Sequence, residues 1–88
     1  MTKTKVKVVS KSGLHARPAD TLTKLASKFQ SKVELICDET RIVNAKSILS
    51  VLAAGIDCGM EVELVCDGED EKEACRELVK AIEAGLGE

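Results

Sequence analysis

The chain has 88 residues and a mass of 9.4 kDa, which is enough for one compact domain and too few for two. Hydrophobic residues make up 44% of the chain and charged residues 32%, with a net charge of −2, a composition that excludes a disordered or fibrous protein. Phe29 is the only aromatic residue, so the chain lacks the stacking side chains that bind single-stranded nucleic acid, and no nucleic-acid partner is expected.

The first thirty residues predict a strand followed by a helix. Valines alternate with lysines over residues 3–9, as in a half-buried strand. Pro18 suits the first turn of a helix, because its missing N–H would be unpaired there in any case. The apolar stripe of that helix is formed by Ala19, Leu22, Leu25, Ala26 and Phe29.

A hairpin and a short helix are predicted next. Residues 33–37 and 41–44 alternate in polarity on either side of a polar turn, which is typical of two paired strands. The segment 47–54 begins with Ser47, a good N-cap residue, and ends before Gly55, a good C-terminal stop. We therefore expect one short helix there.

The last two predicted elements are a strand and a helix. Residues 61–66 alternate with their acidic side chains outward, and Asp70 and Glu73 then stand at the spacing of a capping box. The helical stripe that follows comprises Ala74, Cys75, Leu78, Val79, Ile82 and Leu86. The order βαββαβα predicts an α+β fold, a two-layer open-faced sandwich with three helices on one face of a four-stranded, mostly antiparallel sheet. Residues 1–88 are expected to form this single domain.

The cellular compartment is inferred from segments that the sequence does not contain. It has no apolar run near the ~18 residues of a membrane span and no signal-peptide core, so we expect a cytoplasmic protein without membrane insertion. The four cysteines have no CxxC spacing, which favours free thiols over a metal site.

Charge is divided unevenly along the chain. Residues 1–46 carry a net charge of +6 and residues 47–88 a net charge of −8. Solvated faces without a functional role explain such asymmetry, and so does an electropositive region that attracts anions or an acidic partner.

Residues 12–19, SGLHARPA, hold the only histidine, His15, together with Arg17 and the only proline, Pro18. Gly13 allows a turn after the first strand, which places His15 at the N-terminus of the first helix. Unpaired backbone N–H groups and the helix dipole favour an anion there, and Arg17 adds a permanent charge. A neutral imidazole in this place can act as a nucleophile toward a phosphoryl group. From the residues alone, a capping histidine and a surface arginine remain equally open.

The same stretch resembles the active-site signature of the HPr family, the phosphocarriers of the bacterial sugar phosphotransferase system. Residues 43–64, VNAKSILSVLAAGIDCGMEVEL, resemble the family's second signature, and the length and element order agree. The resemblance implies that Nδ1 of His15 takes a phosphoryl group from phosphorylated enzyme I and passes it to a sugar-specific enzyme IIA, while Arg17 neutralises phosphate charge. The residues expected beside the phosphate are Ser12, Ala16 and Pro18.

The resemblance also implies a carrier that needs no cofactor and acts as a monomer, rather than an enzyme with turnover of its own. Ser47 suits a helix cap, and the resemblance further implies that an ATP-dependent HPr kinase/phosphorylase modifies it. A catabolite-control regulator is then an expected partner. The expected partner surface comprises Ala16, Lys24, Ile48, Leu49 and Leu52.

Some features depart from the family pattern and some alternatives stay open. Ser47 lies 32 positions after His15, one more than expected, and the extra residue is most simply placed in the turn at 38–40.

A metal-carrying domain would need a CxxC loop, and a hydrolase with His15 as general base would need a carboxylate or serine partner and a deep pocket. The remaining alternative is an HPr paralogue in a nitrogen-type phosphorelay, or a regulatory binding module in carbon catabolite control.

Overall fold

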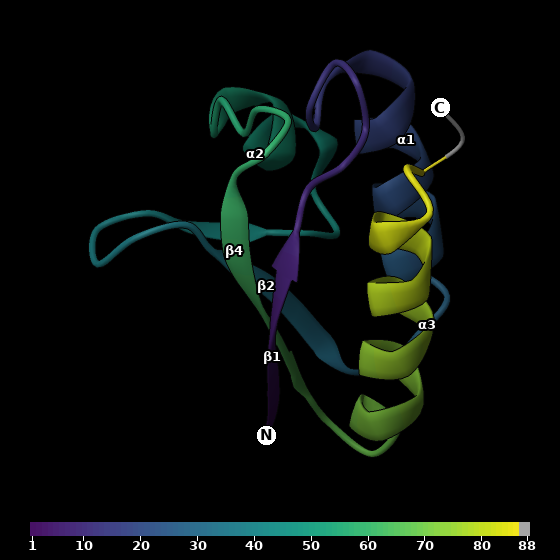
Figure 1. The fold of residues 1–88 in the computed structure, drawn as a ribbon. Coiled ribbons are helices and arrows are strands. Elements are labelled where there is room, and N and C mark those ends of the chain that lie inside the picture. The colour runs from purple at the N-terminus through teal and green to yellow at the C-terminus, as the bar shows by residue number, and fades with distance from the viewer. Residues whose placement is uncertain (87–88) are drawn as a thin grey trace.

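A computed structural model describes residues 1–86 of the chain (Figure 1). Four strands form one antiparallel sheet in the order β1-β4-β2-β3. The strands are β1 (Thr2–Lys7), β2 (Lys32–Ile36), β3 (Ile42–Asn44) and β4 (Glu61–Asp67). The helices are α1 (Ala16–Ala26), α2 (Ile48–Ala53) and α3 (Glu71–Glu83). The predicted element order and the α+β open-sheet class are confirmed.

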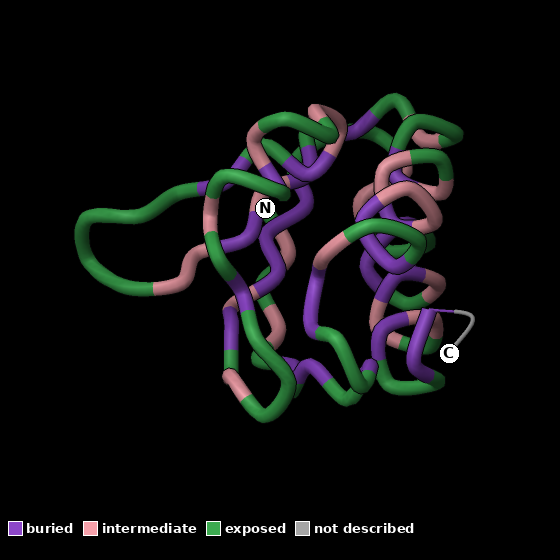
Figure 2. Tube along the Cα trace, turned by 90° about the horizontal axis from the view of Figure 1, so that it is seen from above, coloured by how far each residue is buried: buried purple, intermediate pink, exposed green. Residues whose placement is uncertain are grey.

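The core lies between the sheet and the helices. Helix α3 packs on β1 and β4, and α1 contacts both α2 and α3. Viewed from above, the buried parts of the strands and helices face one another across the middle of the molecule (Figure 2). Leu35 and Leu64 lie opposite each other on β2 and β4 and are fully buried, as are Leu22 and Leu78 on the helices. Burial of each such side chain stabilises the fold by about 1.5–3 kcal/mol.

Three predicted elements end two or more residues earlier than their patterns indicate. Helix α3 ends at Glu83, although its predicted apolar stripe runs to Leu86, which is buried but lies beyond the helix. Strand β1 ends at Lys7 and not at residue 9, although the Val8 N–H still donates to the Met60 carbonyl at 2.9 Å. Helix α1 ends at Ala26, three residues before Phe29. Phe29 nevertheless packs against the core, because its N–H bonds to the Ala26 carbonyl at 3.2 Å in a tighter turn.

The predicted capping box at the start of α3 is wrong. Asp70 is the N-cap residue, but its side chain makes no cap hydrogen bond. Its carboxylate instead accepts from the hydroxyl of Ser31 and from the N–H groups of Gln30 and Ser31, both at 2.9 Å. The Ser31 hydroxyl and these amides lower the pKa of Asp70. Asp70 therefore ties the turn after α1 to the start of α3.

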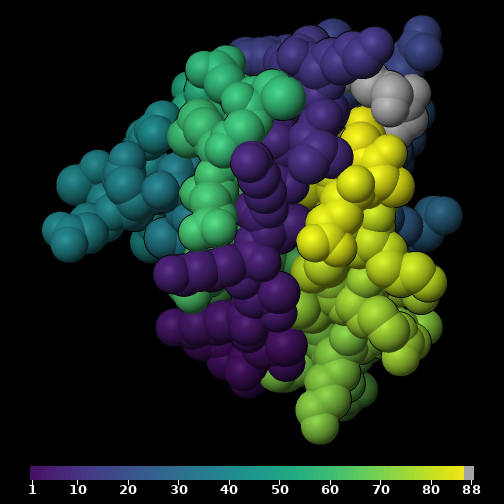
Figure 3. Space-filling model, in the orientation of Figure 1, coloured from purple at the N-terminus to yellow at the C-terminus, as the bar shows by residue number. Residues whose placement is uncertain are grey.

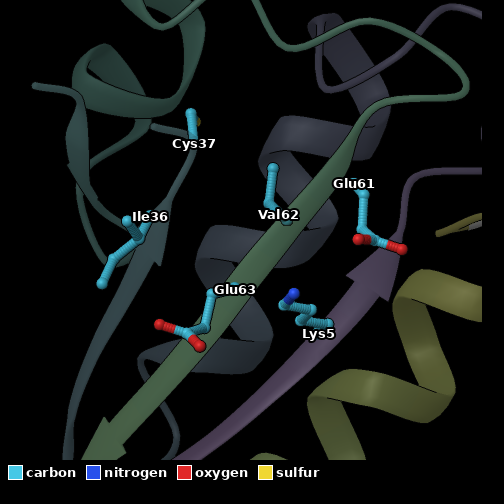
Figure 4. Close-up of a pocket in the computed structure, with 6 residues that line it drawn as sticks. All are labelled: Lys5, Ile36, Cys37, Glu61, Val62 and Glu63. Atoms are coloured by element: carbon cyan, nitrogen blue, oxygen red, sulfur yellow. The ribbon is translucent and has the colours of Figure 1, made fainter. Parts of the chain in front are cut away.

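Over residues 1–86, α1 and α3 leave the second face of the sheet uncovered (Figure 1). Lys5 lies opposite Glu63 and Lys7 opposite Glu61, so neighbouring strands present opposite charges there. A shallow depression of about 270 Å³ crosses this face and draws its walls from β1, β2 and β4 (Figure 4). Its lining residues are Lys5, Ile36, Cys37, Glu61, Val62 and Glu63, none of which was predicted to act in function.

Figure 3 shows β1 on the surface of the molecule, with α3 alongside it. Cys75 on α3 donates to the Thr4 hydroxyl on β1 at 3.3 Å, so the helix contacts this strand directly. Within residues 1–86, no helix combines the length and the hydrophobicity that a bilayer crossing requires.

Candidate functional site

His15 occupies the place that the sequence predicts for it. It is the N-cap residue of α1, with extended backbone angles of φ −118° and ψ 162°, and the helix begins at Ala16. Its side chain makes no cap hydrogen bond. The imidazole is 43% exposed, so both solvent and a docking protein can reach the ring.

The first turn of α1 leaves backbone donors unused beside this ring. Ala19 N–H bonds to the His15 carbonyl at 3.4 Å, and Pro18 has no N–H. The N–H groups of Ala16 and Arg17 have no hydrogen-bond partner among residues 1–86. Ala16 has a φ of +43°, a backbone region that L-residues with a Cβ rarely adopt. An anion at this position would meet two free donors and the positive end of the helix dipole.

The loop before His15 is anchored to the segment that follows α2. Leu14 is fully buried, and its N–H donates to the Ile56 carbonyl at 2.8 Å. Ser10 closes the turn by donating from its hydroxyl to the Gly13 carbonyl at 2.9 Å. These contacts join the backbone next to the histidine to the segment after α2.

The structure also places a carboxylate beside the ring, which the sequence analysis did not predict. The Oδ1 atom of Asp57 lies 3.6 Å from Nε2 of His15. Asp57 follows α2 and is far from His15 in the chain, so no local spacing signals the contact. Packing of the two loops brings the residues together.

The remaining residues predicted beside the phosphate surround the same helix start. Arg17 is exposed and makes no ion pair with any residue of 1–86, so its guanidinium is available to an incoming anion. Ser12 and Ala16 are exposed, whereas Pro18 is buried. Lys24, predicted on the partner surface, is exposed and pairs with Asp20 at 3.0 Å.

Ser47 is the N-cap residue of α2, as predicted, and its hydroxyl oxygen accepts the N–H of Ser50 at 3.3 Å. Ile48, Leu49 and Leu52 are exposed apolar residues of this helix, and Leu49 is 77% exposed. Helices α1 and α2 contact each other, and the start of α1 lies at the same end of the sheet as α2 (Figure 1). The His15 loop adjoins the C-terminal side of α2 and Ser47 stands at its N-terminus, so the length of this six-residue helix, about 9 Å, separates the two regions.

All four cysteines are free thiols. Cys66 and Cys75 are buried in the core, and burial raises the pKa of Cys66 to about 12. Over residues 1–86, no cluster of three or more histidine, cysteine or acidic side chains has the geometry to hold a metal ion.

The comparisons with known proteins agree with this geometry. The family described as "PTS HPr component phosphorylation site" matches residues 2–84. The phosphocarrier protein HPr of Treponema pallidum is 50% identical over 66 residues, which cover 75% of this chain and 74% of that protein. The HPr of Neisseria meningitidis is 39% identical over 88 residues and covers 100% of this chain and 98% of its own. A crystal structure of HPr-C-His from Thermoanaerobacter tengcongensis superposes with a TM-score of 0.93 at 40% identity, over 100% of this chain and 98% of the other. This chain therefore belongs to the HPr family of phosphocarrier proteins.

Proposed function

We propose that this phosphocarrier holds its phosphoryl group on Nδ1 of His15. The observation that carries the proposal is the single histidine of the chain at the N-cap of α1, beside the N–H groups of Ala16 and Arg17, which bond to no other group within residues 1–86. The Nδ1 lone pair forms the new bond to phosphorus while the bond from phosphorus to the side chain of the donor protein breaks, and that side chain keeps the electron pair. The two amides and the Arg17 guanidinium neutralise charge on the phosphoryl oxygens. Such a transfer depends on positioning and charge stabilisation.

The partners follow from this chemistry and from the family. We infer that phosphorylated enzyme I is the donor and that an enzyme IIA is the acceptor, in the cytoplasm. Both partners must approach the exposed edge of one imidazole, so the protein acts as a carrier between active sites, without turnover or a cofactor of its own. The test is reconstitution: phosphoenolpyruvate and enzyme I should add one acid-labile phosphoryl group, which added enzyme IIA should remove. A chain that stays unlabelled in this mixture would contradict the proposal.

Arg17→Ala is expected to slow phosphoryl exchange with enzyme I at least tenfold, because a charge-assisted hydrogen bond to the phosphoryl group is worth about 1.5–3 kcal/mol. The free energy of unfolding should change by no more than about 0.5 kcal/mol, since the side chain is exposed and makes no ion pair within residues 1–86. Rapid-quench transfer rates and urea unfolding measure the two quantities. Arg76→Ala, which removes another exposed arginine from α3, is the matched control and should transfer normally. A destabilised Arg17→Ala protein with normal transfer would instead make Arg17 structural.

We further propose that Ser47 is a site of regulatory phosphorylation by an HPr kinase/phosphorylase. Its hydroxyl is half-buried at the N-terminus of α2, where helix N–H groups tolerate a negative charge. Ile48 and Leu49 follow it and expose apolar surface at the end of the molecule that carries His15. A phosphate there would place about −2 charge beside the surface on which partners dock, and so weaken binding without unfolding the helix.

Ser47→Asp is expected to weaken association with enzyme I by roughly tenfold or more. Desolvation of the charge and repulsion from an acidic partner should cost about 1–3 kcal/mol of binding, and 1.4 kcal/mol corresponds to a factor of ten. Titration calorimetry measures the affinities, and circular dichroism should show an unchanged fold. The matched control is Ser47→Asn, whose side chain has nearly the same shape and capping ability as that of the Asp variant but no charge. Its affinity for enzyme I should match that of the wild type. Equal affinities for the Asp and Asn variants would leave Ser47 as a helix cap only.

A further inference from the structure

The ring of His15 contacts the carboxylate of Asp57. Nε2 of the imidazole lies 3.6 Å from Oδ1 of Asp57, within ion-pair distance, and no other acidic side chain of residues 1–86 comes as close to the ring. The Asp57 side chain is 75% exposed and pairs with no other cation in that part of the chain. Nδ1, the other ring nitrogen, is not engaged by this carboxylate.

The backbone of Asp57 is held in place by contacts on both sides. The preceding carbonyl, that of Ile56, accepts the Leu14 N–H at 2.8 Å, which ties this segment to the residue next to His15. The Asp57 carbonyl accepts the Met60 N–H at 3.2 Å, and its own N–H donates to the Met60 sulfur at 3.2 Å. The carboxylate therefore stands beside the ring because the two loops are joined.

We propose that Asp57 is a positioning residue for the phosphoryl acceptor. Its carboxylate favours the tautomer of His15 that carries the proton on Nε2, and this tautomer leaves the lone pair of Nδ1 free to attack phosphorus. The inference rests on the function proposed above. It assigns to this carboxylate both the orientation of the ring and the choice of the reacting nitrogen.

The same carboxylate also acts during the transfer. As the Nδ1–P bond forms, the bond from phosphorus to the side chain of the donor protein breaks, and that side chain keeps the electron pair. The Nε2 proton stays on His15, so the ring gains a positive charge that Asp57 stabilises. The carboxylate thus favours the phosphorylated state of this protein over that of the donor. Because the pair is exposed, the effect is of the size of a surface ion pair, about two- to fivefold in the equilibrium constant, and salt should reduce it.

Long-range ¹H–¹⁵N NMR of the free protein tests the positioning role without any partner. At a pH where the ring is neutral, the wild type should carry its proton mainly on Nε2, and Asp57→Ala should raise the ratio of the Nδ1–H to the Nε2–H form at least twofold. Glu69→Gln removes an exposed carboxylate that makes no ion pair within residues 1–86, and it should leave the ratio unchanged. An identical ratio in the wild type and Asp57→Ala would overturn the proposal.

Phosphoryl exchange with enzyme I tests the charge effect. Asp57→Asn keeps the size of the side chain and removes its charge. The equilibrium constant for phosphoryl transfer from enzyme I to this protein should therefore fall by about two- to fivefold, and the decrease should be smaller at high salt. An unchanged equilibrium constant would overturn this second role. A wild type that enzyme I does not phosphorylate would contradict the proposed function itself, whereas the tautomer ratio would still decide whether Asp57 orients the ring.

Discussion

His15→Ala is expected to abolish phosphoryl transfer while leaving the fold intact. No other histidine exists in the chain to take over the group. The side chain makes no cap hydrogen bond and is partly exposed, so its loss removes neither a cap nor a core contact. The free energy of unfolding should therefore change by no more than about 0.5 kcal/mol. Intact-mass spectrometry after incubation with phosphoenolpyruvate and enzyme I should find one added phosphoryl group on the wild type and none on the variant.

Two controls separate the nucleophile from the rest of the site. Ser47→Ala should be labelled like the wild type, because enzyme I is proposed to act on the histidine and not on the serine. The label on the wild type should be lost in mild acid and survive in base, as expected for a phosphorus–nitrogen bond. If enzyme I labels His15→Ala to the same extent as the wild type, the assignment of the nucleophile is wrong.

The part of the site that sequence reasoning located depends on short-range rules. Gly13 permits the turn and Pro18 favours the first helical turn, so the start of α1 follows from residues within a few positions of His15. The N-cap role of Ser47 is equally local, since its hydroxyl accepts the N–H of Ser50 three residues later. Alternation of apolar and polar residues was likewise enough to find all four strands.

The parts that were missed depend on contacts between distant segments. Asp70 has the spacing of a capping residue, yet donors from Gln30 and Ser31 occupy its carboxylate, and these come from a loop that only the fold brings near. Asp57 reaches His15 for the same reason, through the hydrogen bond that joins Leu14 to Ile56. A local sequence pattern cannot predict which partner a carboxylate will bind, because the distant segment that supplies the partner is not part of the pattern.

Gly13→Ala should destabilise the protein more than any of the other substitutions predicted for this site. Gly13 has a φ of +71°, where a residue with a Cβ is strained. A Cβ at this position would also lie 2.3 Å from the Ile56 carbonyl oxygen and 2.7 Å from the Asp57 Cα. Both are backbone atoms, so no side-chain rotation can relieve the overlap. The variant must push the Ile56–Asp57 segment away from the loop that carries His15.

Gly55→Ala is the matched control, because Gly55 has a similar φ of +64°. Apart from its two chain neighbours, no residue of 1–86 lies within 4 Å of an added Cβ there. The control should cost about 1–2 kcal/mol from backbone strain alone, whereas Gly13→Ala should cost roughly 3 kcal/mol or more, since strain and overlap act together. Urea unfolding of both variants measures the difference. Hydrogen exchange at the Leu14 amide should quicken only in Gly13→Ala, because that amide loses its acceptor when Ile56 is displaced. Equal unfolding free energies and equal exchange rates in the two variants would show that the Gly13 loop and the Ile56–Asp57 segment are not in close steric contact. The placement of Asp57 beside His15 by this contact would then be contradicted.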